Sequence, residues 1–289
     1  METKDLLKKV RKIEIKTRKL SSNIFGGEYH SAFKGRGMTF SEVRNYQFGD
    51  DVRTIDWNVT ARYNEPFVKI FEEERELTLM LMVDVSNSAL FGTNNALKKN
   101  IITEISATLA FSALQNNDKV GLILFSDQVE LYIPPSKGKT HVLRIIIREL
   151  IEFKPLSKKT DIKVALEFLT RILKKKSITF ILSDFISSDY EKSLKIISKK
   201  HDLTGIKVYD KFEEAIPNLG LVQMFDQETE EIKMIDTSSK LLRDNYKREM
   251  SLNFKKFNDL FTKNGAGTIS CRTDESYIKK LLNYFKNRG

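Results

Sequence analysis

Cysteine, proline and histidine are all scarce in this chain of 289 residues. The single cysteine, Cys271, excludes an internal disulfide and any zinc site built from several thiolates, and such a chain is typical of a reducing compartment. The most apolar stretches, LTLMLMVDV and ITFILSDFI, have the length of strands and are too short to cross a bilayer. The N-terminal sequence METKDLLKKVRKIEIK is charged and lacks the apolar core of a signal peptide. We therefore expect a cytoplasmic protein without a transmembrane segment.

Hydrophobic residues make up 40% of the chain and charged residues 30%, which is typical of a soluble globular protein. The formal net charge of +10 raises the question of nucleic acid, because lysine side chains attract phosphate. However, the lysines are spread over several predicted helices with acidic residues among them, and no nucleic-acid-binding motif accompanies them. The pattern favours solvated helix faces; a basic surface that binds anionic membrane or nucleic acid is kept as an alternative function.

The first 76 residues are predicted to form an N-terminal arm. Residues 4–20 have the apolar spacing of an amphipathic helix, and the Gly-punctuated segment 24–40 is expected to be a loop. The segment EPFVKIFEEERE reads as an extended strand that leads into the core of the main domain. Because no self-sufficient apolar pattern precedes residue 65, we expect the arm to pack onto that domain and not to fold alone.

Residues 77–289 alternate buried strands with helices. A continuous apolar run such as LTLMLMVDV is typical of a central parallel strand that is covered on both faces. Strands that alternate with helices of this length predict right-handed crossovers, and hence an α/β fold with a doubly wound, mainly parallel sheet. The segment near 218–236 departs from this rhythm and reads as an antiparallel hairpin insertion. Helices are expected at about 95–115, 139–152, 161–175, 189–200, 239–263 and 274–287.

Polar residues follow two of the predicted strands at the points where ligands bind in open α/β sheets. Asp84, Ser86 and Ser88 form a D-x-S-x-S motif after the first strand, and Asp184 follows the strand SITFILS. Thr160 lies between them, in the loop LSKKTD. Three hydroxyls and two carboxylates match the oxygen ligands of Mg²⁺, with Mn²⁺ or Ca²⁺ as alternatives, and so few anionic ligands leave the ion open to a partner's carboxylate.

Each of these residues also has a purely structural interpretation. Ser86 or Ser88 can cap the helix that follows, and Thr160 can cap a helix that begins at Asp161. Asp184 can simply end a strand. The D-x-S-x-S motif alone is weakly specific, and its position at a strand end together with Thr160 and Asp184 is what favours a metal site.

The set of Asp84, Ser86, Ser88, Thr160 and Asp184 resembles the metal-ion-dependent adhesion site of von Willebrand factor A (vWA) domains. Upstream, GRGMTFSEVRNYQFGDDVRTIDWNVTARYNEPFVKIFEEE resembles the signature of the bacterial domain-of-unknown-function family fifty-eight. This resemblance covers roughly residues 25–210, and Ala89 departs from it where many members have Met. It implies a non-enzymatic protein-binding module that serves as an adaptor or partner of a MoxR-type AAA+ ATPase. A vWA-fold scaffold whose metal site stays empty is a further alternative.

Trp57, the only tryptophan, is expected to anchor a core. The arginines of the signature are expected to pin the arm to the main domain by pairing with its acids: Arg44, Arg53 and Arg62 with Asp50, Asp51 and Asp56.

No catalytic set emerges from the sequence. A haloacid-dehalogenase-type phosphatase needs a second carboxylate two residues after the strand-end Asp84, and Ser86 occupies that position. The segment SKGKT imitates the end of a phosphate-binding loop, but Ile133 stands where its first glycine belongs. The histidines (His30, His141 and His201) lack metal-binding spacing, and Cys271 has no positioned histidine, so we expect a buried, inert thiol. We therefore expect a protein that is not an enzyme.

Overall fold

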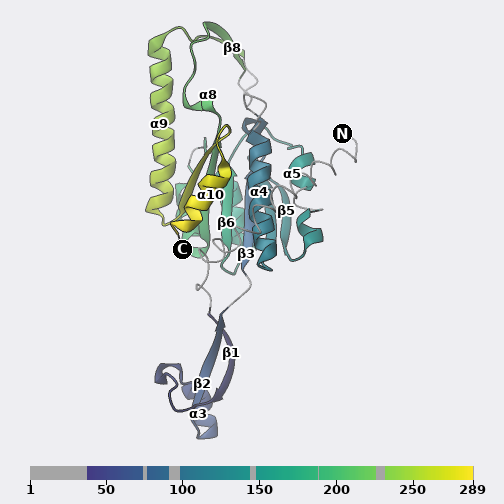
Figure 1. The fold of residues 1–289 in the computed structure, drawn as a ribbon, viewed down its shortest axis with the longest axis vertical. Coiled ribbons are helices and arrows are strands. Elements are labelled where there is room, and N and C mark those ends of the chain that lie inside the picture. Colours follow the sequence, from purple (N-terminus) through teal and green to yellow (C-terminus); the bar gives the residue numbers. More distant parts are fainter. Residues whose placement is uncertain are drawn as a thin grey trace.

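The computed structural model describes residues 38–73, 77–90, 98–143, 148–187, 189–225 and 232–288. A six-stranded sheet with helices on both faces forms the centre of the molecule (Figure 1). Its strands are β3 (Thr78–Asp84), β4 (Lys119–Phe125), β5 (Val129–Ser136), β6 (Ile178–Ser183), β7 (Asp202–Tyr209) and β10 (Gly267–Arg272). The helices around it are α4 (Lys98–Gln115), α5 (Arg148–Glu152), α6 (Ile162–Ile172), α7 (Glu191–Lys200), α8 (Lys211–Glu214), α9 (Lys240–Lys263) and α10 (Tyr277–Lys286).

The strand order is β10-β7-β6-β3-β4-β5, and every neighbouring pair is parallel except β4 with β5. This confirms the predicted α/β fold with a doubly wound, mainly parallel sheet. After β3 the chain first adds β4 on one side, and it later returns to place β6 on the other side of β3. The winding therefore reverses between β3 and β6. The carboxyl ends of these two strands form the crevice where α/β sheets bind ligands.

Alternation along β3 divides the core into two layers. Leu79, Leu81 and Val83 pack with α4, α5 and α10, while Met80 and Met82 pack with α6, α7 and α9. Figure 1 shows α4 and α10 lying across the same face of the sheet. Because both faces are covered, every residue between Thr78 at the start of the strand and its last residue is apolar. That last residue is Asp84, so a carboxylate follows directly on a fully buried strand.

The helix α9 lies close against the sheet at Gly205 in β7. A Cβ atom at Gly205 would lie 2.6 Å from a ring carbon of Phe261, a distance that real Cβ atoms essentially never show. The glycine thus allows the Phe257 and Phe261 rings to reach the strand. This packing covers the face beneath the loop that follows β6, where Phe185 contacts the same two rings.

Residues 38–73 form a small unit of their own, which Figure 1 shows apart from the central sheet. In it β1 (Met38–Asn45) pairs antiparallel with β2 (Phe67–Glu73), and η2 (Val52–Thr54) and α3 (Trp57–Tyr63) lie between them. The expected strand in EPFVKIFEEERE is thus β2, but it pairs with β1 and does not enter the core. Residues 38–40, expected to be loop, begin β1. The helix expected at 4–20 lies outside the described residues.

Two expectations for this unit are wrong. Trp57 is 70% exposed at the start of α3, so it anchors no core. Among the described residues, the acids bond within the unit and none contacts the main domain: Arg44 forms a two-pronged pair with Asp50, with both distances 2.8 Å, and Asp56 caps α3. The division of the chain at residue 76 stays a prediction, because residues 74–76 are not among those described.

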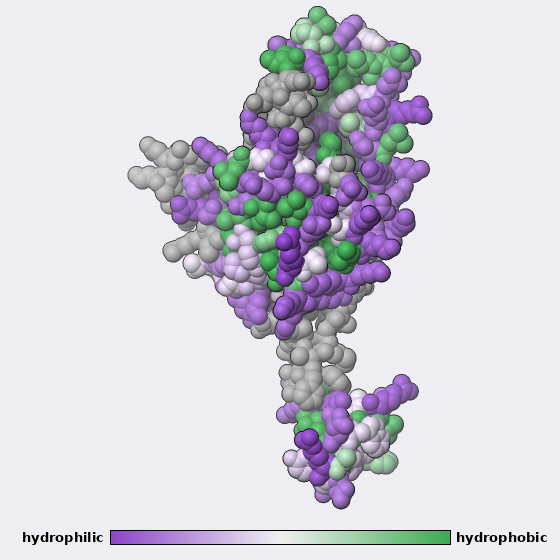
Figure 2. Space-filling model, turned by 180° about the vertical axis from the view of Figure 1, so that it is seen from behind, coloured by the Kyte–Doolittle hydropathy of each residue, from purple (hydrophilic) through white to green (hydrophobic). Residues whose placement is uncertain are grey.

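The segment after α8 forms a two-stranded antiparallel hairpin, β8 (Leu221–Phe225) and β9 (Ile232–Asp236). Figure 2 shows hydrophobic residues gathered at the end of the molecule where this hairpin lies. Exposed apolar side chains on and beside the hairpin are Leu219, Leu221, Met224, Ile232 and Met234. The hairpin therefore carries an apolar surface that no described residue covers.

Candidate metal-binding site

Asp84 ends β3 with a side chain that is almost fully buried, at 2% exposure. Its Oδ1 accepts the backbone N–H of Ser86 at 3.0 Å, and its Oδ2 accepts the hydroxyl of Ser183 at 2.6 Å. Burial, followed by the nearby charge of Asp184, raises the pKa of Asp84 to about 6. A carboxylate in this environment favours a bound proton or a cation over a free negative charge.

Ser86 and Ser88 lie in the turn directly after Asp84. The turn continues as the short helix η3 (Asn87–Leu90), so successive residues curl around the strand end. The hydroxyl of Ser86 is buried and lies 3.0 Å from the hydroxyl of Ser88. The next long helix, α4, begins only at Lys98, so neither serine caps it. Ser86 directly precedes η3, so its interpretation as a cap of the helix that follows stays a prediction.

Asp184 follows β6 and is likewise buried, at 5% exposure. Its Oδ1 accepts the backbone N–H of Ile186 at 3.2 Å, and its Oδ2 accepts the Lys98 ammonium at 3.2 Å. Burial pushes the pKa of Asp184 upward, but the charge of Lys98 and hydrogen bonds, including one from Ser88, outweigh it and hold the pKa below its ordinary value. Asp184 is thus the more acidic carboxylate of the pair, and Asp84 is the one that binds a proton more readily.

The turn after Asp184 has a strained backbone. Phe185 has a φ of 55°, in the left-handed region that residues other than glycine rarely adopt. Its ring is buried against Tyr190, Phe257 and Phe261, with the ring centroids of Phe185 and Phe257 4.5 Å apart. Packing therefore fixes a backbone conformation that local preference disfavours, and the fixed turn sets the direction of the Asp184 side chain.

Thr160 lies in the loop between α5 and α6, and its Oγ1 is buried without a hydrogen-bond partner among the described residues. It does not cap α6, because Asp161 holds the cap position and accepts the N–H of Lys163. The loop is tied to the D-x-S-x-S turn by the N–H of Asn87, which donates to the carbonyl of Lys158 at 3.2 Å. A buried hydroxyl costs free energy unless something bonds it, so the site lacks one partner for Thr160.

The structure thus brings Asp84, Ser86, Ser88 and Asp184 together through direct contacts. Thr160 is joined to them through the contact of its loop with Asn87. Within the described ranges no group of three His, Cys, Asp or Glu side chains converges in the way that a metal site rich in charged ligands requires. An ion here would have to depend on hydroxyl groups and water for much of its coordination, as Mg²⁺ does.

Sequence reasoning missed several residues that support this site. Ser183 bonds Asp84 from β6, and Lys98 and Glu213 form an ion pair beside Asp184 with their charged atoms 2.5 Å apart. Glu130 accepts the N–H groups of Leu156 and Ser157, both at 3.1 Å, and so anchors the loop that carries Thr160. No sequence motif predicts these residues, because they contact the site from elements that are distant in sequence. Lys98, at 1% exposure, looked like one more basic residue on a helix.

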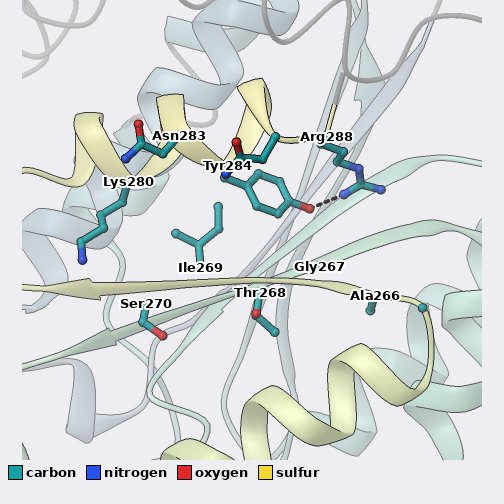
Figure 3. A pocket seen from close by; sticks show the side chains of 11 residues that line it. Ala266, Gly267, Thr268, Ile269, Ser270, Lys280, Asn283, Tyr284 and Arg288 are labelled. Carbon is teal, nitrogen blue, oxygen red and sulfur yellow. Dashed lines mark hydrogen bonds between the residues drawn. The ribbon is translucent and has the colours of Figure 1, made fainter.

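A separate cavity of about 670 Å³ lies between β10 and α10, at the edge of the sheet (Figure 3). Its charged groups are already paired: Arg288 bonds Tyr284 and Asp202, and Lys280 bonds Glu275. Among its described lining residues it therefore lacks the closely spaced like charges and the buried, unbonded hydroxyl that mark the carboxyl end of β3. Cys271, in the neighbouring strand, is buried as predicted, and burial raises its thiol pKa to about 12.

The fold and the D-x-S-x-S turn define a vWA-like α/β protein. The family model described as "Protein of unknown function DUF58" matches residues 42–255, and the chain belongs to this family. The protein Rv1480 of Mycobacterium tuberculosis is 26% identical over 283 residues, which cover 96% of this chain and 88% of that protein.

Solved structures with a similar arrangement include an aerotolerance-related membrane protein from Bacteroides fragilis. It is 16% identical, covers 73% of this chain and 99% of its own chain, and has a TM-score of 0.47. A von Willebrand factor type A protein from Catenulispora acidiphila is 9% identical, covers 77% of this chain and 43% of its own chain, and has a TM-score of 0.39.

One prediction needs correction after these comparisons. The sequence was interpreted as that of a cytoplasmic protein, and the likeness to the Bacteroides fragilis protein, which is described as a membrane protein, contradicts that placement. Within the part of the chain that the structure describes, no helix combines the length and the apolar character that a membrane span requires.

Proposed function

We propose that this protein is a non-enzymatic, Mg²⁺-dependent protein-binding module whose ion is completed by a carboxylate from the partner. The proposal rests on the buried polar groups in the crevice between β3 and β6. Two buried carboxylates, Asp84 and Asp184, act on each other electrostatically there, and the pKa of Asp84 is raised to about 6 by burial and by Asp184. The buried hydroxyl of Thr160 has no bonding partner within the described ranges. A bound divalent cation would offset the repulsion between the two carboxylates and would also bind the Thr160 hydroxyl.

The hydroxyls of Ser86, Ser88 and Thr160 are the groups that would hold Mg²⁺, with Mn²⁺ or Ca²⁺ as alternatives. Asp84 and Asp184 already accept hydrogen bonds at both of their carboxylate oxygens. They therefore act best by supplying charge from close by and by orienting the serines. When bound, the ion supplies a Lewis-acidic position that attracts a carboxylate. Because the direct ligands are neutral, that attraction stays strong.

The absence of catalysis is part of this proposal. The position two residues after Asp84 holds Ser86, whose hydroxyl bonds Ser88, so no second carboxylate is placed there as a general acid. We expect the purified protein to hydrolyse no phosphoester above background. Turnover that disappears in an Asp84→Ala variant would contradict this part of the proposal.

The partner we propose is a MoxR-type AAA+ ATPase, which the resemblance of the signature segment to its family implies. The exposed apolar side chains on the β8–β9 hairpin also favour a protein partner, because contiguous apolar surface is unusual on a protein without one. The hairpin follows α8, whose Glu213 pairs with Lys98 beside Asp184. A partner that bonds the ion through a carboxylate can therefore also cover apolar surface.

Calorimetric titration of Mg²⁺ into the full chain tests the metal part of the proposal. We expect binding at millimolar concentration or below, and a loss of at least a hundredfold in affinity in Asp84→Asn. A matched control is Asp202→Asn, which removes a buried carboxylate at the opposite end of the sheet, where Asp202 pairs with Arg288. Wild-type protein that binds no Mg²⁺ even with a carboxylate-bearing partner present would contradict the proposal and favour the scaffold with an empty site.

The partner is tested with the purified MoxR-type ATPase encoded by the same genome. We expect a complex in Mg²⁺ that is lost in EDTA and in Asp84→Asn, but kept in Asp202→Asn. Binding to DNA or to anionic vesicles that weakens steeply with salt and ignores EDTA would instead support the basic-surface alternative.

A further inference from the structure

Lys98, the first residue of α4, is among the largest fully buried side chains described in the molecule. Its Nζ lies 3.2 Å from Oδ2 of Asp184 and 2.5 Å from Oε1 of Glu213 in α8. A buried ammonium is tolerated only where anionic partners surround it. The chain thus places a permanent positive charge in direct contact with one of the two carboxylates of the candidate metal site.

The position of Lys98 places its ammonium where it would repel a metal ion bound at the site. A divalent cation held by the hydroxyls next to Asp184 would lie close to the Lys98 ammonium, and like charges repel strongly in a buried site. The ammonium also satisfies the Asp184 oxygen that would otherwise attract the cation. The Lys98 ammonium therefore competes with a metal ion for Asp184 and lowers the affinity of the site for that ion.

Glu213 acts on the same lysine from the other side. It is the third residue of α8, where its carboxylate also accepts the N–H of Asp210 at 2.8 Å and completes the helix cap. This anchoring holds the carboxylate within reach of Lys98, so the ammonium is shared between a carboxylate of the site and one outside it. A change that weakens the ion pair between Glu213 and Lys98 therefore strengthens the interaction of the Lys98 ammonium with Asp184.

We propose that Lys98 is the residue that sets the metal affinity of this site, by competing with the metal for Asp184, and that Glu213 sets the strength of this competition. This inference rests on the proposed function. It predicts that the site binds an ion more weakly alone than after a partner's carboxylate joins it. Lys98 and Glu213 are positioning residues: Lys98 contacts Asp184, and Glu213 contacts Lys98.

The test is a set of Mg²⁺ titrations on the full-length protein with two single variants that change affinity in opposite directions. Lys98→Met keeps the length of the side chain and removes its charge, so we expect Mg²⁺ affinity to rise at least tenfold. Glu213→Gln leaves the Lys98 charge to Asp184, so we expect the affinity to fall at least threefold. A purely structural ion pair would give two destabilised proteins with affinities changed in the same direction or not at all.

The double variant Lys98→Met with Glu213→Gln controls for folding and for the route of the effect. It leaves no ionised Glu213 without its ammonium, so we expect it to be more stable than Lys98→Met alone, and it provides the measurement if the single variant does not fold. Because Glu213 acts through Lys98, its affinity should match that of Lys98→Met within about threefold. Wild type that binds Mg²⁺ while both Lys98→Met proteins bind it equally or more weakly would overturn the inference and leave the proposed function standing. Loss of Mg²⁺ binding in every protein, wild type included, would overturn both.

Discussion

The two ends of the central sheet both bury polar groups, and strand β6 runs from one to the other. At its amino end Ser177 bonds His201, and nearby Arg288 pairs with Asp202. At its carboxyl end Ser183 bonds Asp84, which lies within electrostatic reach of Asp184. The amino end thus joins neutral or opposite partners, whereas the carboxyl end brings two like charges together.

This difference distinguishes a structural polar cluster from the candidate binding site. At the amino end burial, assisted by the charges of Lys200 and Lys176, lowers the pKa of His201 to about 4, so the imidazole stays neutral. At the carboxyl end burial and the charge of Asp184 raise the pKa of Asp84 to about 6. The negative charge of Asp84 is therefore destabilised in the folded protein. Groups whose pKa is shifted by burial and by a like charge cluster at functional sites. The comparison predicts that variants at one end change stability and variants at the other change metal binding.

The largest effect on stability should come from the amino end. Arg288→Met removes the guanidinium that bonds Asp202, Tyr284 and Thr204, and leaves a buried carboxylate without that partner. We expect a loss of about 4 kcal/mol in the free energy of unfolding. Urea denaturation measures this, and Mg²⁺ titration should give the wild-type affinity.

The matched control is Arg272→Met, which removes a more exposed arginine from surface carboxylates and should cost less than about 1 kcal/mol. Arg288→Met protein that is fully stable yet loses Mg²⁺ binding would break the division between the two ends.

The next effect concerns acid and His201. Its Nδ1 accepts the hydroxyl and the N–H of Ser177 at 2.8 and 3.2 Å, so protonation breaks the bond from the N–H and forces the bond with the hydroxyl to reverse. Below its ordinary pKa of 6.5 the unfolded chain binds a proton that the folded chain does not bind until about pH 4. Stability should therefore fall by up to about 3 kcal/mol as pH drops from 6.5 to 4. Denaturation of wild type and His201→Asn across this range should show a shallower slope in the variant.

The third prediction returns to the carboxyl end. Asp84 binds a proton more tightly in the folded chain, with a pKa of about 6 against an ordinary 3.8, so metal-free stability falls as pH rises through this window. Asp84→Asn removes this cost, and after the loss of charge-assisted hydrogen bonds from Ser183 and Ser86 we expect a net gain of about 2 kcal/mol at pH 7 in EDTA.

Thermal or urea melts in EDTA and in saturating Mg²⁺ provide the check. In Mg²⁺ only wild type should be stabilised further, by linkage to binding. A less stable Asp84→Asn in EDTA, with wild type indifferent to Mg²⁺, would mean that Asp84 serves the fold alone.

The sheet and the polar residues at its crevice were predictable because they are encoded locally. An apolar run that ends in Asp84 identifies both a covered strand and a strand-end carboxylate, and the alternation of strands and helices gives the winding. Register then brings β3 and β6 together, with Val83 paired to Leu182, one residue before Asp84 and two residues before Asp184.

What failed or was missed depends on contacts between distant segments. Nothing near Lys98 in the sequence indicates that its ammonium reaches Asp184 and Glu213. Trp57 was expected in a core because large aromatic side chains are usually buried. However, α3 belongs to a small unit in which Val68 is the only buried hydrophobic residue among those described. Short two-stranded units bury little, so composition alone does not reveal which side chains they leave outside.

The smallest predicted effect compares two serines at the ends of one strand. Ser177→Ala and Ser183→Ala each remove a buried hydroxyl with two hydrogen-bonding contacts, so each should cost about 1 kcal/mol of stability. Only Ser183 supports the ionised form of Asp84, through its 2.6 Å bond to Oδ2. Ser183→Ala should therefore weaken Mg²⁺ binding about tenfold, as loss of a group that orients a metal site does, while Ser177→Ala leaves it unchanged. Calorimetry on the two variants side by side decides this, and equal Mg²⁺ affinities would erase the distinction between the two ends of the sheet.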